Sequence, residues 1–374
     1  MSSKGKGGLE DVIVTSSAIC NLNEKINIVE IRGYDLLDLA EHSSFEEVCF
    51  LLWYSKLPSA KELTEFTRTL ANHRQIPTGM IELIKRLPRT STMDSLRTWI
   101  SALAAYDSEP DNTSTEAVLR RITKITAVMP TIAAAAYRIS QRQEVIQPDL
   151  HLNHAQNFLH MILGKEVSTS LSRAFEKSLV LYSEHELNAS TFSARIITST
   201  LSDIYSAITA AIGTLKGPLH GGANEEAMRL LLTIESPENA ERYVRSLLAH
   251  KRRVMGFGHR IYKLGDPRAK LMKQISEEIG EETGQTRWHE ICEQVEEVVG
   301  AEKKLFPNLD FYSAPAYYCL GIPIDLYTPI FASSRVSGWS AHILEQLQSN
   351  RLIRPRTMYV GPNGLKYVPL SERQ

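Results

Sequence analysis

Two histidines stand beside glycines at breaks between segments with a helical pattern. His220 occurs in GPLHGGANE (217–225), and His259 occurs in MGFGHR (255–260). Glycine at a helix start permits a sharp entry of the chain into that helix, which is a packing role. It also lets another molecule come close to the backbone, and a histidine there would face that molecule. A single histidine at a helix boundary is more often a cap or a satisfied polar group than a catalytic residue.

One carboxylate lies at a third break. In LFPNLDFYSAP (305–315) a helix is expected to end at Pro307, which leaves Asp310 in a short connection. Taken alone, Asp310 is more simply interpreted as an N-cap of the following helix. Considered together with the two histidines, Asp310 is a candidate base.

Arginines at further breaks extend the set. Asp266 is a good N-cap and Pro267 suits the first helical position, so Arg268 is expected in the first turn of a helix. More arginines occur in RVSGWSAH (335–342) and RLIRPR (351–356). An isolated surface arginine is usually a solvated charge of small energetic effect.

The combination indicates one shared site. Two or three guanidinium groups would suit a small dicarboxylate, because they bind carboxylates bidentately. A carboxylate and two imidazoles supply a base and two hydrogen-bond donors. A metal site fits less well, because HELNA (185–189) lacks the second histidine of an H-E-x-x-H motif.

The elements that must position these residues are almost all helical. Strand signals are confined to 11–19 and 25–31, which are rich in β-branched residues and predict a small hairpin joined by CNLNE (20–24). Ser44 and Glu47 have capping-box spacing before an apolar run that stops at Pro58. Helices are predicted over 60–73, 93–106, 115–140, 151–163, 168–186, 190–213, 225–234, 237–253, 267–283, 285–304 and 329–350. Strands do not alternate with these helices, so a doubly wound sheet is excluded and an all-α fold is expected.

The segment 185–214 is dense in Ala, Ser, Thr and Ile. Small side chains let helices approach closely, so this segment is expected to be central and buried. Arg195 and Asp203 within it would then need partners.

Composition sets wider limits. The 374 residues are 43% hydrophobic, which allows a large core and two domains. Lys and Arg number 42 against 43 for Asp and Glu, so no overall field favours nucleic acid or a membrane surface as a partner. The longest apolar helical stretch, 125–137, is too short for a membrane span. The four cysteines form no C-x-x-C pair, and the first residues have no signal-peptide pattern, so a cytoplasmic protein with reduced thiols is expected.

Taken together in their order and spacing, the motifs resemble the citrate synthase family, including its 2-methylcitrate synthases, over nearly the whole chain. The length is similar to that of the shorter bacterial and archaeal type. The motifs are GLEDVIVTSSAI, EIRGYDLLDLAEHSSFEEVCFLLW, MDSLRT, HELNASTFSAR, GPLHGGANE, GFGHRIYKLGDPRA, PNLDFYSA, SRVSGWSAHILEQ and RLIRPR.

The resemblance implies a fold and an activity. The fold is an all-α homodimer whose subunits have a large domain (1–221 and 322–374), a small domain (222–321) and the active site between them. The reaction condenses acetyl-CoA with oxaloacetate through an enol or enolate and then hydrolyses the thioester to citrate and CoA. The alternatives are a 2-methylcitrate synthase that uses propionyl-CoA and, more remotely, a non-catalytic homologue that binds CoA or a dicarboxylate. No metal and no permanently bound cofactor is implied, and acyl-CoA is a co-substrate.

The matched motifs also imply roles for single residues. His220, His259 and Asp310 correspond to the catalytic residues of the family. Arg354 is expected to reach the partner subunit's site. The expected oxaloacetate ligands are His185, Arg268, Arg335 and Arg354, and the candidate CoA contacts are Gly256, Gly258, Arg260 and Lys263. Gly221 and Gly222 are hypothesised to let the thioester lie against the backbone.

Overall fold

The computed structural model of the chain describes residues 7–9, 12–23, 25–86, 90–259 and 261–373. These residues form sixteen α-helices and one small antiparallel sheet, which confirms the predicted helical class. Short 3-10 segments occupy Gly7–Leu9, Leu103–Tyr106, Ile324–Leu326 and Leu370–Glu372. No helix in the described ranges is both long and apolar enough to cross a membrane.

The sheet contains β1 (Cys20–Asn23), β2 (Ile28–Ile31) and β3 (Tyr34–Asp35), with Cys20 opposite Ile31. A hairpin was expected here, but its predicted first strand is wrong. The described residues 12–19 form no strand, and β1 occupies most of the segment predicted as the turn. The chain reverses at Asn27, which has a φ of 55°, a conformation that Asn tolerates better than most residues. A reversal there pairs β2 with the residues just before it, so the β-branched residues further upstream have no partner strand.

The helices after the sheet begin at side-chain caps. Ser44 caps α2 by accepting a hydrogen bond from the Glu47 amide at 3.1 Å, and Ser59 and Glu62 form a complete capping box at α3. Pro130 lies inside α6, which has the bounds that the sequence predicts. The helices are α1 (Leu36–His42), α2 (Phe45–Tyr54), α3 (Ala60–Asn72), α4 (Thr78–Arg86), α5 (Thr92–Ala102), α6 (Thr115–Ser140), α7 (His154–Leu163) and α8 (Thr169–Tyr182).

The helix predicted over 190–213 is two helices, α9 (Ala189–Ser199) and α10 (Ile204–Leu215). The break occurs at Leu201, whose φ is 63°. Asp203 then caps α10, because its carboxylate accepts the Ser206 amide at 2.9 Å. Both helices pack on α16 (Tyr327–Gln348), which is buried along most of its length and forms the centre of the larger helical group.

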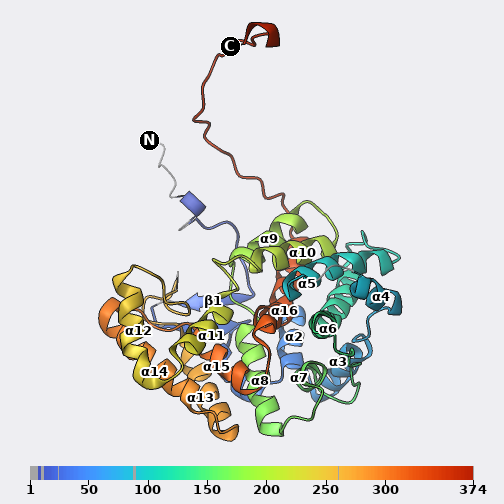
Figure 1. Cartoon of the computed structure of the whole chain (residues 1–374). Helices are drawn as coiled ribbons and strands as arrows, with labels where there is room; N and C mark the ends of the chain where they lie inside the picture. The colour runs from blue at the N-terminus through green and yellow to red at the C-terminus, as the bar shows by residue number, and fades with distance from the viewer. Residues whose placement is uncertain (1–6, 10–11, 24, 87–89, 260, 374) are drawn as a thin grey trace.

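The remaining helices pack mainly on one another, at the left of Figure 1. They are α11 (Ala223–Ile234), α12 (Pro237–Ala249), α13 (Pro267–Glu282), α14 (Arg287–Lys303) and α15 (Leu309–Cys319). The short connection predicted around Asp310 is wrong, because Asp310 lies in the first turn of α15. Asn308 accepts the Asp310 amide at 3.1 Å and caps this helix, so Pro307 precedes a helix rather than ending one.

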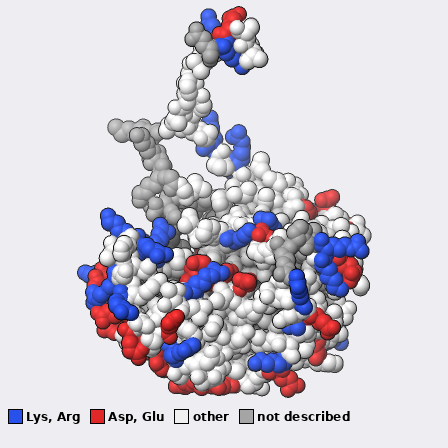
Figure 2. Space-filling view, viewed as in Figure 1, with Lys and Arg blue, Asp and Glu red and all other residues white. Residues whose placement is uncertain are grey.

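The C-terminal residues after α16 leave the body of the molecule as an extended tail (Figure 1). Residues 354–359 are exposed, and so are Leu365, Tyr367 and Leu370. On the face shown in Figure 2, positive and negative side chains are interspersed, in keeping with the balanced composition.

Candidate active site

A cleft of about 1250 Å³ lies where the two groups of helices meet. It is lined by the segment after α8 and by the residues that lead into α11, α13 and α15. Of the predicted site residues, the lining includes His185, His220, Gly256, Gly258, His259, Lys263, Arg268, Asp310 and Arg335. Two predicted residues are not among them. Arg354 is exposed in the tail of its own chain, and Arg260 lies outside the described residues.

His220 is half-buried just before α11 and is held from one side by Ser190. Its Nε2 is 2.8 Å from the Ser190 hydroxyl and accepts the Ser190 amide at 3.3 Å. Because a backbone amide only donates, Nε2 carries no proton in the neutral ring, and the proton lies on Nδ1. Burial, with a smaller contribution from the Arg335 charge, lowers the pKa of His220 to about 4. The ring is therefore neutral near pH 7.

The two glycines after His220 differ in their surroundings. A Cβ on Gly221 would lie 2.5 Å from the Leu215 carbonyl oxygen, so packing alone requires glycine there. A Cβ on Gly222 would meet nothing within 4 Å. Open space beside the backbone, as hypothesised for an approaching ligand, is therefore found at Gly222 and not at Gly221.

His259 follows a turn made by Gly256 and Gly258, whose φ values are 83° and 78°. Its Nδ1 accepts the amides of Ile261 and Tyr262 at 3.2 and 3.3 Å, so the proton of the neutral ring lies on Nε2. Burial lowers the pKa of His259 to about 4, with a further contribution from a nearby arginine. Its ring stacks on Tyr262 with centroids 4.5 Å apart.

His185 is buried and stands next to His259, with ring centroids 5.1 Å apart. Its Nε2 is 2.9 Å from the Tyr262 hydroxyl. Burial holds its pKa well below the ordinary value, and the charge of Arg268 acts in the same direction. Two neutral imidazoles therefore line the cleft next to each other, and the Tyr262 side chain contacts both of them.

Asp310 is half-buried and receives a hydrogen bond from the Tyr182 hydroxyl, 2.7 Å from its Oδ1. Burial raises the pKa of Asp310 to about 6. The Tyr182 hydrogen bond and the charges of Arg268 and Arg335 oppose that rise, whereas Asp266 adds to it. A carboxylate with this pKa is ionised at neutral pH and is a stronger base than an exposed aspartate.

Both buried arginines of the cleft are held by defined partners. The Nε and Nη2 of Arg268 donate to the two oxygens of Asp266 at 2.9 and 2.8 Å. Asp266 caps α13 as predicted and also accepts the Leu309 amide at 3.2 Å, so it joins the starts of α13 and α15. The Nε of Arg335 donates to the Tyr182 carbonyl at 2.6 Å, and its guanidinium lies over the Phe331 ring.

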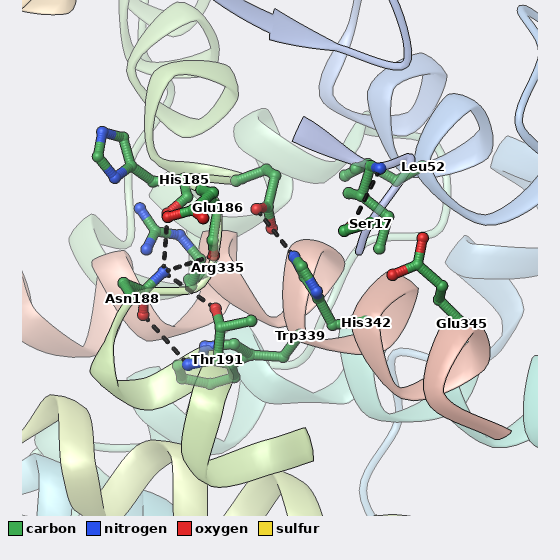
Figure 3. Close-up of polar contacts among 12 residues, drawn as sticks. Ser17, Leu52, His185, Glu186, Asn188, Thr191, Arg335, Trp339, His342 and Glu345 are labelled. Atoms are coloured by element: carbon green, nitrogen blue, oxygen red, sulfur yellow. Dashed lines mark hydrogen bonds and ion pairs between the residues drawn. The ribbon is translucent and has the colours of Figure 1, made fainter. Parts of the chain in front are cut away.

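A buried polar chain supports the segment that carries His185, and Figure 3 shows two of its members, His342 and Glu345, on α16. Glu184 lies 3.1 Å from His342 of α16, and His342 lies 2.8 Å from Arg195. Arg195 also pairs with Glu345 at 2.8 Å, so the partners expected for this buried arginine are present. Gly338 faces Glu184 so closely that a Cβ there would clash with the carboxylate.

Asn188 shapes the same segment. Its amide nitrogen donates to the carbonyls of His185 and Glu186 at 3.2 and 3.4 Å, while its side-chain oxygen caps α9. Glu186 adopts a φ of 52°, which turns the chain away from α8. Figure 3 shows His185 and Asn188 on this turn beside Arg335. One short segment therefore positions an imidazole and starts a helix.

The sequence interpretation missed several residues of the cleft. None of them was singled out from the sequence, although Ser190 and Tyr262 lie within the quoted motifs HELNASTFSAR and GFGHRIYKLGDPRA. Some of the missed residues that line the cleft are positively charged. They lie near a glycine-rich segment or at the end of a helix. The missed residues that line the cleft are Tyr182, Arg252, Arg253, Lys303 and Phe331. Ser190 and Tyr262 were missed as well, and they contact His220 and His185 from behind the lining.

Known proteins share this sequence and fold. The model of the citrate synthase C-terminal domain matches residues 8–356. The chain is 49% identical to citrate synthase 2 of Bacillus subtilis, with 98% of each chain covered, and 43% identical to 2-methylcitrate synthase 1 of Corynebacterium glutamicum, with 99% of each covered. It superimposes with a TM-score of 0.92, at 35% identity and 98% coverage of both chains, on citrate synthase of Thermoplasma acidophilum in a ternary complex with carboxymethyl coenzyme A and oxaloacetate. The chain belongs to the citrate synthase family.

Proposed function

We propose that this enzyme is a citrate synthase, which condenses acetyl-CoA with oxaloacetate and hydrolyses the thioester to citrate and CoA. The observation that carries the proposal is the cleft itself. Asp310, His220 and His259 face it together with two buried arginines. The relatives that carry the citrate synthase name give the same reaction independent support. The product would enter the tricarboxylic acid cycle.

Asp310 is the base of the proposed first step. It takes a proton from the methyl carbon of the thioester, and the negative charge moves to the thioester oxygen. His220 donates its Nδ1 proton in a hydrogen bond to that oxygen. A neutral imidazole is suited to this because it has one proton to donate and does not repel the arginines around it.

The acceptor is oxaloacetate. Arg268 and Arg335 each bind one of its carboxylates, with His185 as a further ligand. His259 donates from Nε2 to the ketone oxygen and protonates it as the carbon–carbon bond forms. In a homodimer, the partner subunit's Arg354 is the remaining oxaloacetate ligand. Arg354 lies in the exposed tail, which can extend to a neighbouring subunit.

CoA requires positive groups at the mouth of the cleft. Arg252, Arg253 and Lys303 are exposed residues that also line it, and we assign them to the phosphates together with Lys263. Gly256 and Gly258 form the turn that precedes His259. Arg260 stays a candidate on sequence grounds alone.

The division into a large domain (1–221 and 322–374) and a small domain (222–321) belongs to the same proposal. Helices α11–α15 fall within the small domain and pack mainly on one another, which supports it. Closure of the two around the substrates would exclude water before the proton is removed. A cytoplasmic location also stays a prediction.

A second candidate is 2-methylcitrate synthase, because relatives with that name are nearly as similar to this chain. The two activities differ by one methylene in the acyl group, which a pocket discriminates by only about 1–3 kcal/mol. A non-catalytic homologue would be expected to have lost part of the catalytic set, and here all three residues are present.

The test is release of free CoA thiol with oxaloacetate, comparing acetyl-CoA with propionyl-CoA at matched concentrations. A higher kcat/KM for acetyl-CoA supports the first proposal, and a higher value for propionyl-CoA supports the second. His220→Ala is expected to abolish thiol release while oxaloacetate still binds. Absence of thiol release from the unmodified protein with either thioester would overturn both proposals.

A further inference from the structure

Tyr182 is the last residue of α8, is 1% exposed, and lies against the proposed base. Its hydroxyl oxygen is 2.7 Å from Oδ1 of Asp310 and 2.8 Å from the hydroxyl of Ser313. Its ring packs on Phe331 with centroids 4.5 Å apart, which fixes its orientation. Tyr182 and Asp310 are 128 positions apart in the sequence, and a hydrogen bond from a ring of fixed orientation joins them.

The direction of these hydrogen bonds follows from the atoms involved. An ionised carboxylate only accepts, so Tyr182 donates its single proton to Asp310. The Ser313 hydroxyl, which also lies 3.1 Å from the Asp310 carbonyl, then donates its one proton to the nearer Tyr182 oxygen at 2.8 Å. The chain of donors runs from Ser313 through Tyr182 to Oδ1 of Asp310, and each bond polarises the next.

This chain distinguishes the two oxygens of the base. Oδ1 is occupied by Tyr182, while no described side chain or amide donates to Oδ2. The Asp310 amide is bound to Asn308, which fixes the backbone of the first turn of α15. Oδ2 is thus the oxygen left to receive a proton from a molecule in the cleft.

Tyr182 also touches the second half of the site. Its backbone carbonyl accepts the Nε of Arg335 at 2.6 Å. One residue therefore holds the base through its side chain and the proposed oxaloacetate-binding arginine through its main chain. A phenylalanine at this position would keep the second contact and lose the first, which separates the two roles experimentally.

We propose that Tyr182 is a positioning residue that holds Oδ1 of Asp310 and presents Oδ2 to the methyl group of the thioester. This inference rests on the proposed condensation. In that step the proton moves from the methyl carbon to Oδ2, the C–H electron pair becomes the enolate double bond, and the carbonyl π pair moves to oxygen. Tyr182 keeps its own proton throughout, because burial and the adjacent carboxylate hold its pKa well above the ordinary value.

The charged and titratable groups that face Asp310 come from three elements besides its own. They are Tyr182 of α8, Asp266 and Arg268 at the start of α13, and Arg335 of α16. The acidic residues at the start of α11 are engaged elsewhere, since Glu225 bonds Thr328 and Glu226 pairs with Arg229. On α15, Tyr317 is buried and bonds Ser178. Removing the Tyr182 hydroxyl would leave all these other groups in place.

The test compares Tyr182→Phe with Tyr317→Phe in the full-length enzyme. Both variants delete one buried tyrosine hydroxyl within hydrogen-bond distance of a serine, but only the first deletes a bond to Asp310. The measurements are kcat, the KM for oxaloacetate and the pH profile of kcat/KM from thiol release. For Tyr182→Phe we expect kcat at pH 7 to fall about tenfold, with KM for oxaloacetate within about twofold of the parent. The acid limb should move upward by about one pH unit, because a hydrogen bond to the ionised carboxylate is lost.

An upward shift of the acid limb in Tyr182→Phe alone supports the proposal. An unmoved limb in that variant, or an equal shift in Tyr317→Phe, overturns it while the condensation activity of the parent enzyme stands. If Tyr182→Phe does not fold, Ser313→Ala removes the preceding donor of the same chain, and it should give a smaller shift in the same direction. An unmoved limb in Ser313→Ala would then overturn the proposal. A parent enzyme that releases no thiol would instead overturn the proposed function, and this inference with it.

Discussion

Arg335→Lys tests whether the buried arginines are there to bind a dianionic acceptor. Arg335 is 2% exposed, and its Nε is held by the Tyr182 carbonyl. Among the described residues, no hydrogen-bond partner is found for its two terminal nitrogens, and the residue lines the cleft. The two terminal nitrogens of the Arg335 guanidinium can therefore donate hydrogen bonds to a ligand in the cleft. Lysine keeps the charge but has no planar fork, so it loses the bidentate geometry.

The size of the effect follows from that loss. A hydrogen bond to a charged group contributes about 1.5–3 kcal/mol. Each 1.4 kcal/mol is a factor of ten in a dissociation constant, so the Kd for oxaloacetate should rise about ten- to a hundredfold. The Kd for CoA should not change, because the phosphates are assigned to other residues.

Titration calorimetry with oxaloacetate measures this Kd directly, and Arg195→Lys is the matched control. Arg195 is also 2% exposed, but it is engaged by Gln346, His342 and Glu345. Because Arg195 reaches the His185 segment only through His342 and Glu184, the control should lower the melting temperature and change the Kd for oxaloacetate much less than Arg335→Lys does. An unchanged Kd in Arg335→Lys would refute the reasoning, and so would an equal rise in both variants.

Three further predictions concern protons and packing. The kcat/KM should fall as the pH drops below about 6, because Asp310 must be ionised to act as the base, and only about a tenth of it remains ionised one pH unit lower. A flat pH–rate profile between pH 5 and 7 would contradict this. Gly338→Ala should lower the free energy of unfolding by about 1–3 kcal/mol in chemical denaturation, because the added methyl group has no space. Gly300→Ala is the control: its methyl group has open space in α14, so the free energy of unfolding should rise by about 0.5–1 kcal/mol. Asp266→Asn leaves the Arg268 charge unpaired, so thermal and chemical melts should show a loss of about 3–5 kcal/mol, and a loss below 1 kcal/mol would show that the pair contributes little.

Local patterns predicted those elements whose start and stop signals lie within a few residues. α6 has the bounds expected from its apolar period, because Ser114 caps it and nothing nearby competes. The break between α9 and α10 was missed, since neither Gly nor Pro marks Leu201, and Asp203 could equally lie within a helix. α15 was missed in part because Pro307 was interpreted as a stop and Pro315 lies inside the helix.

The candidate site divides in the same way. His220 and His259 could be found from sequence because glycines flank them in the chain. Tyr182 and Ser190 could not, because they contact Asp310 and His220 only after segments far apart in sequence have packed together. Residues that a local sequence signal marks could be predicted. Residues that reach the site only through the packing of other segments could not.

The charges around Asp310 link acceptor binding to base strength. Burial raises the pKa of Asp310, while Arg268 and Arg335 lower it, and the balance is a pKa of about 6 in the free enzyme. A bound dianion would neutralise both arginines and so remove the part of the balance that weakens the base. The pKa of Asp310 should then be higher in the complex, and its carboxylate better able to take a proton from a weakly acidic methyl group. The two arginines proposed to bind the acceptor would thereby keep the pKa of Asp310 lower until the acceptor is present. On this reasoning, the electrostatics of the cleft disfavour enolisation of a thioester that binds without the acceptor.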